Sequence, residues 1–144
     1  MGGLQIAGSY EWQPGPLLNF GNLFFYGNLN DINTGTGTLD RWFNTDGFER
    51  VASKGPAAFH RRVFPTRISG LRQDMTNQLN ATAQRDFKLG ERLSFQARVD
   101  AINVTNRSQF DAPDMNPYST NFGKIVQQTA ASNRVLQIVG RFRF

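Results

Sequence analysis

Side chains that could take part in catalysis are few and isolated in this sequence. His60 is the only histidine and cysteine is absent, so the chain lacks a thiol nucleophile and the usual cysteine–histidine ligand set for zinc. No serine stands in a Gly-x-Ser-x-Gly elbow, and the Asp111/Asp114 pair lies in a turn-like, proline-containing segment. We therefore predict a protein that is not an enzyme and that carries neither a metal nor a cofactor.

A glycine-threonine segment, Thr34–Thr38, superficially resembles a phosphate-binding loop. It lacks the Gly-Lys-Ser/Thr ending of that loop, and no helical pattern follows it. We interpret this segment as a turn. His60 lies beside Arg61 and Arg62, and we interpret it as a polar loop residue.

The basic residues could bind an anionic partner. The chain carries 16 Lys and Arg residues against 11 acidic ones, giving a net charge of +5. Nucleic acid is not favoured, because most of the Arg residues are scattered and would suit loops and a polar barrel face equally well. They cluster only within residues 59–72, where a loop could bind carboxylates, or phosphates such as those of lipopolysaccharide. The alternative, which the residues favour, is a loop held by hydrogen bonds from Arg to backbone and Asp. The candidate ligand-binding residues are Trp42, Arg61, Arg62, Arg67 and Arg72.

Four segments alternate between apolar and polar residues, as a strand with one apolar face does. These segments are residues 4–12, 77–88, 91–105 and 133–144. They are longer than the ~5–6 residues common in soluble strands and suit a tilted membrane strand of ~9–11 residues. Arg85 interrupts one apolar face, and Ile102 and Val104 shift the phase of another, which predicts a bulge or the membrane boundary.

The connections between these segments are very unequal in length. A tight turn at Leu89–Glu91 joins the second and third segments, whereas residues 14–76 and 106–132 form long connections. If the strands run up and down, both long connections leave one side of the sheet, which is the asymmetry of outer-membrane barrels. Within the first of them, residues 17–20 and 23–26 are predicted to form short strands.

Several motifs resemble the end of Oar-like TonB-dependent receptors, and together they cover nearly the whole chain. The strand Gly3–Gln13 with its Pro-Gly-Pro-Leu turn, the Trp-Phe-Asn-Thr stretch from Trp42 and the segment Arg62–Arg72 are similar to that family. So are residues 91–110 and the Asn-Phe-Gly-Lys-Ile stretch at 121–125. The chain also ends on a phenylalanine, so Phe142 and Phe144 resemble the barrel-assembly signal of outer-membrane proteins.

The resemblance implies an all-β fold of antiparallel up-and-down strands with long loops, part of a large barrel of roughly 22 strands. Residues 1–144 would supply C-terminal strands and extracellular ligand-facing loops, without the plug domain. The implied location is the bacterial outer membrane. The implied partners are outer-membrane lipid and lipopolysaccharide, the barrel-assembly machinery, the rest of the receptor barrel and an unidentified ligand. The isolated chain would self-associate through its exposed strand edges.

Two other interpretations remain open at this point. The chain could be a free-standing soluble β-module whose apolar strand faces form a core and which binds a ligand or assembles with copies of itself. A small hydrolase is the third possibility, and the missing nucleophile elbow and the single histidine argue against it.

Overall fold

The fold is all-β in a computed structural model that describes residues 3–35 and 37–144. Its strands are β1 (Gln5–Gln13), β2 (Thr76–Lys88), β3 (Ser94–Ile102) and β4 (Val135–Arg143). Single 3₁₀ turns are η1 (Leu29–Asp31), η2 (Ala52–Lys54) and η3 (Ala130–Ser132). Within the described ranges, no helix has the length and apolar character needed to cross a membrane.

The chain divides into two compact units, which are described separately. The strand unit contains residues up to Gln13 together with Thr76–Gln109 and Ala130–Phe144. The loop unit contains Pro14–Met75 and Phe110–Thr129, so it is built from most of the two long connections.

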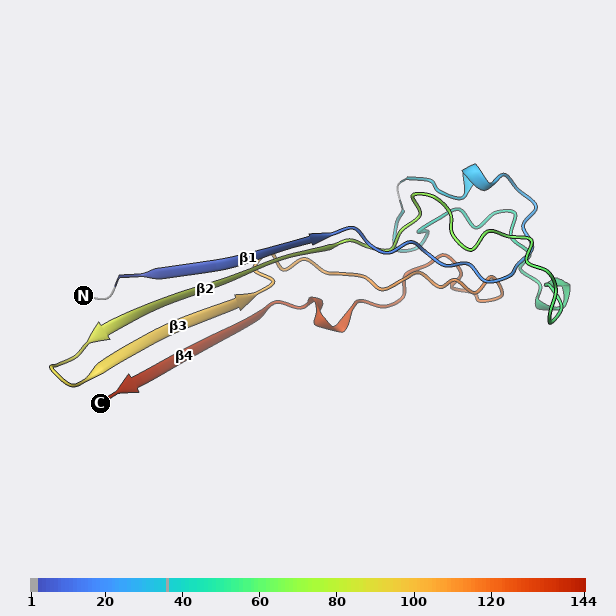
Figure 1. The fold of residues 1–144 in the computed structure, drawn as a ribbon. Coiled ribbons are helices and arrows are strands. Elements are labelled where there is room, and N and C mark those ends of the chain that lie inside the picture. The colour runs from blue at the N-terminus through green and yellow to red at the C-terminus, as the bar shows by residue number, and fades with distance from the viewer. Residues whose placement is uncertain (1–2, 36) are drawn as a thin grey trace. The chain divides into compact units, whose positions relative to one another are not determined.

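The strand unit is one antiparallel sheet in which each strand pairs with its neighbour in the sequence, in the order β1-β2-β3-β4 (Figure 1). The predicted up-and-down topology is therefore confirmed. A tight hairpin joins β2 and β3, where the Leu89 amide donates to the Leu93 carbonyl at 2.9 Å. At the opposite end of the sheet, Gln13 pairs with Thr76. Both long connections leave from that end, because β3 also finishes there.

One face of the sheet carries the apolar side chains that the alternation predicts. A central cross-strand row on this face contains Ile6, Ala83, Val99 and Ile138. The side chains are not covered, since Ile6 is 74% exposed and Ile138 is 81% exposed. These exposures contradict the alternative in which the apolar strand faces form a soluble core.

The other face of the sheet is polar and joined by hydrogen bonds across the strands. Asp100 accepts from the Thr82 hydroxyl at 2.7 Å and from Arg98 Nε at 2.9 Å. Gln84 donates to the side chain of Gln5 on the neighbouring strand. A sheet with one apolar face and one hydrogen-bonded polar face is typical of a barrel wall between lipid and a wet interior.

The third strand is shorter than predicted. It ends at Ile102 rather than at residue 105, and its register with β4 continues without a bulge to the pairing of Ile102 with Val135. The next residue, Asn103, has a φ of 53°, a left-handed conformation that ends an extended strand. The phase shift seen in the sequence therefore marks the end of the strand, not a bulge within it.

The hydrophobic core lies in the loop unit, where every buried apolar side chain of the described residues is found. Its members are Leu18, Phe20, Leu23, Ile32, Phe43, Phe48, Phe64, Leu71, Phe122 and Ile125. The centroid of the Phe20 ring lies 5.2 Å from that of Phe64 and 5.6 Å from that of Phe43, and both pairs are edge-on. Such pairs contribute about 0.5–1.5 kcal/mol each beyond the burial of their area.

Backbone pairing in the loop unit is irregular. The predicted short strands at residues 17–20 and 23–26 are wrong, because only single bridges form, between Leu17 and Arg72 and between Phe25 and Phe48. A backbone hydrogen bond nevertheless joins the two long connections, since the Trp42 amide donates to the Gly123 carbonyl at 2.8 Å.

We predict that a charge is tolerated on only one face of the sheet. Ile138→Arg should lower the free energy of unfolding by about 2–4 kcal/mol, the cost of a cation at the lipid-facing midplane of a barrel. The matched change Gln137→Arg, one residue away on the polar face, should be close to neutral. Urea unfolding of the protein in phospholipid bilayers measures both, and equal losses in the two variants would contradict the assignment of the faces.

Candidate functional site

Arg62 in the basic stretch is turned toward the backbone of its own unit. Its Nη1 donates to the carbonyls of Phe20 and Gly21, both at 3.1 Å, and to that of Phe64 at 3.4 Å. The Phe20 and Phe64 side chains belong to the aromatic core, so Arg62 joins two segments that contribute to it. Arg62 thus makes the Arg-to-backbone hydrogen bonds that the sequence analysis gave as the alternative to ligand binding.

Trp42 and Arg72 form a second structural link. The Trp42 indole Nε1 donates to the Arg72 carbonyl at 2.7 Å, and its ring packs against the core. Arg72 Nη1 in turn donates to the Gly15 carbonyl at 2.9 Å. The structure therefore places both predicted site residues in contacts that hold the loop unit together.

Arg67 lies beside a hollow in the loop unit. The residues that line it are Leu29, Asn30, Asn33, Pro65, Arg67, Ile68 and Ser69. Its volume of about 460 Å³ falls within the range usual for small-molecule pockets. Arg67 Nε donates to Asn19 Oδ1 at 2.9 Å, and no partner in the described chain takes the four N–H groups on its two terminal nitrogens.

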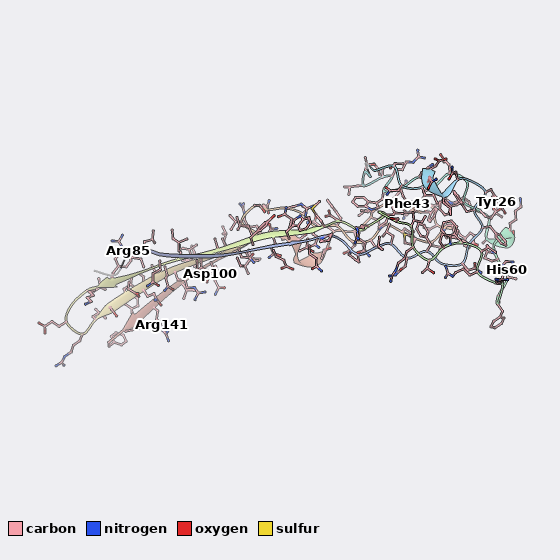
Figure 2. All side chains as sticks on the ribbon, turned by 45° about the horizontal axis from the view of Figure 1, so that its top comes forward. Tyr26, Phe43, His60, Arg85, Asp100 and Arg141 are labelled. Atoms are coloured by element: carbon pink, nitrogen blue, oxygen red, sulfur yellow. The ribbon has the colours of Figure 1, made fainter. Side chains whose placement is uncertain are left out.

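Arg61 and His60 lie at the surface of the loop unit. No described residue forms an ion pair or hydrogen bond with the Arg61 side chain, so its guanidinium is free to meet a partner. His60 Nδ1 lies 2.7 Å from the Arg61 carbonyl, and its ring contacts that of Phe24 edge-on at 5.3 Å. Figure 2 shows His60 among the loops. Across residues 3–35 and 37–144, no group of acidic residues and histidine could hold a metal ion.

The glycine-threonine segment forms a turn over the part that the structure describes. Thr36 lies outside the described residues. The Gly35 amide donates to Asn33 Oδ1 at 3.1 Å, and the amides and carbonyls of Thr38 and Arg41 pair with each other at 2.9 and 3.1 Å.

Aromatic side chains mark two levels on the apolar face of the sheet. Near the hairpin, Phe87, Phe95 and Phe142 form one cross-strand row, with ring centroids 6.1 and 4.8 Å apart. At the other end, Trp12 pairs with Asn77, which is ten positions before Phe87 on the same strand. At ~3.3 Å per residue and a tilt of ~40°, the two levels are about 25 Å apart along the membrane normal. That separation matches the apolar band of a membrane barrel.

The two phenylalanines predicted to form the assembly signal lie at the hairpin end of the sheet. Phe142 belongs to the aromatic row, and Phe144 follows β4 and is 98% exposed. No contact in the described chain tests their recognition by a partner, so that role stays a prediction.

Asn103 is a structural residue that was not among the candidate site residues predicted from the sequence. It is 3% exposed, and its Nδ2 donates to the carbonyls of Arg107 at 2.9 Å and Ser132 at 2.6 Å. Its own amide donates to Asn80 Oδ1 at 3.0 Å. An asparagine directly after an apolar alternation was the available signal, since Asn tolerates the left-handed conformation that ends the strand.

The architecture agrees with a comparison against protein families. A profile described as outer membrane beta barrel domain matches residues 2–137. The chain belongs to this family. An outer membrane beta barrel domain resides in the bacterial outer membrane, where its apolar face contacts lipid and its polar face points to the interior. No significant match was found among curated proteins or among solved structures.

We predict that the Arg residues of the basic stretch differ sharply in how much they stabilise the loop unit. Arg62→Ala should lower the free energy of unfolding of the loop unit by about 1–3 kcal/mol, because three backbone carbonyls lose a charged donor. Arg61→Ala should leave it unchanged. Limited proteolysis of the membrane-embedded protein measures the difference, and equal cleavage rates for the two variants would contradict the assigned contacts.

Proposed function

We propose that this outer membrane beta barrel domain forms part of the wall and the external loops of a TonB-dependent receptor that captures a ligand and imports it. The main support for this proposal is that the two long connections fold into a unit with an aromatic core of their own. Loops longer than ~12–15 residues are usually functional or disordered, and a buried core fits the functional case. The resemblance of the loop motifs to Oar-like receptors supports the same role.

The hollow beside Arg67 is the proposed point of capture. Its apolar side consists of Leu29, Pro65 and Ile68, while Arg67, Asn30 and Asn33 bring polar groups to the same space. A guanidinium with unused N–H groups binds carboxylate or phosphate oxygens in pairs, and the neighbouring amides suit hydroxyl groups. We propose an anionic ligand with several hydroxyl or carboxylate oxygens.

The proposed role is binding and transport, without chemical conversion of the ligand. The surroundings of His60 support this proposal, because its Nδ1 faces a backbone carbonyl and its ring faces Phe24. In the described chain no serine hydroxyl or carboxylate lies within hydrogen-bond distance of the His60 ring, as a catalytic triad would require.

Uptake by intact cells tests the proposal. Cells producing the protein would be offered a panel of radiolabelled anionic metal chelates, with and without an uncoupler of the proton gradient. We expect uptake of at least one chelate to stop with the uncoupler, because TonB-driven import uses that gradient. Arg67→Ala should reduce this uptake about tenfold, in line with the loss of charged hydrogen bonds.

Lys54→Ala provides the matched control, since Lys54 is an exposed cation of the same loop unit outside the hollow. Uptake that continues in the uncoupled cells would indicate a passive pore and contradict a TonB-dependent receptor. Equal uptake by Arg67→Ala and Lys54→Ala cells would contradict capture at the hollow.

A further inference from the structure

Arg85 is the only charged side chain on the apolar face of the sheet among the strand residues that the structure describes. Its cross-strand row contains Ala97 and Gly140, two of the small residues on that face. No ion-pair partner for Arg85 occurs in the described chain. A cation on the lipid-facing side of a barrel is costly near the midplane and close to neutral near the membrane interface.

The position of Arg85 relative to the aromatic row fixes its depth. Arg85 lies two positions before Phe87 on β2, so its backbone is about 5 Å deeper in the membrane than the row at ~3.3 Å per residue and ~40° tilt. Its guanidinium carbon lies 5.2 Å from the centroid of the Phe87 ring. The side chain therefore extends toward the aromatic row, at the level where headgroups begin. Figure 2 shows Arg85 at the hairpin end of the sheet.

We propose that Arg85 binds the phosphate of a phospholipid in the leaflet at the hairpin end of the sheet. A guanidinium presents paired N–H donors that fit phosphate oxygens, and its hydrophobic stem can lie along the apolar face. The small side chain of Ala97 leaves that stem uncovered, while Phe87 screens one side of the guanidinium. In barrels of this family the short turns face the periplasm, and the leaflet on that side consists of phospholipid.

This inference depends on the barrel family and not on the proposed receptor function. A failure of TonB-dependent uptake would leave it untouched.

Lipid binding can be measured on the protein extracted in detergent from outer membranes, by native mass spectrometry during titration with phosphatidylglycerol. Arg85→Gln should weaken phosphatidylglycerol binding about tenfold, because a charged hydrogen-bond donor is lost. Arg85→Lys should fall between the wild type and Arg85→Gln, because lysine keeps the charge but not the paired donors. Diacylglycerol with the same acyl chains, which lacks the phosphate, should bind wild type and Arg85→Gln equally.

Arg141→Gln is the matched control, because Arg141 lies on the polar face of β4 one position from the aromatic row. Its phosphatidylglycerol binding should equal that of the wild type. Circular dichroism checks that each variant keeps its strand content. Equal phosphatidylglycerol binding by Arg85→Gln and Arg141→Gln would overturn the proposal. So would an effect of Arg85→Gln on lipopolysaccharide binding alone, since the phosphate would then come from the other leaflet.

Discussion

The antiparallel register of the four strands is the constraint on which the rest of the structure depends. Because side chains alternate strictly between the two faces, a shift of one residue in the pairing of β4 with β3 would move Ile138 to the polar face. A shift of one residue in the pairing of β3 with β2 would carry Asp100 and Arg98 to the lipid side, at a cost of several kcal/mol. The cross-strand hydrogen bonds and the apolar rows thus favour a single register. The membrane stabilises this register because its apolar side chains then face lipid.

A sheet used in this way contributes no apolar core of its own, so the long connections must be stabilised separately. The loop unit achieves this with edge-on phenylalanine pairs around Phe20 and Phe43 and with side-chain donors to the irregular backbone. Buried or crowded carbonyls outside regular structure need such donors. Arg62 and Trp42 supply these donors, and their hydrogen bonds hold the loop unit together. Arg67, beside the hollow, keeps unpaired N–H groups that could bind a ligand.

The sequence predicts the strand unit far better than the loop unit. Period-2 alternation locates all four strands to within a few residues, and the short Leu89–Glu91 turn determines the topology. The aromatic core of the loop unit follows no period, because Phe20, Phe64 and Phe122 meet from distant parts of the chain. The partners of Arg62 are backbone carbonyls, which leave no trace in residue types. Sequence reasoning could therefore locate the basic stretch but could not separate its structural members from its candidate ligand-binding members.

The absence of cysteine from the chain makes the central claim, a barrel wall between lipid and an aqueous interior, directly measurable. Single cysteines introduced in turn at residues 96–101 of β3 can each carry a spin label in the protein reconstituted into phospholipid bilayers. We expect collisions with oxygen, which is concentrated in lipid, to peak at 97, 99 and 101, while a water-soluble nickel reagent reaches 96, 98 and 100. Accessibility without this two-residue period, or with the two reagents exchanged, would contradict it.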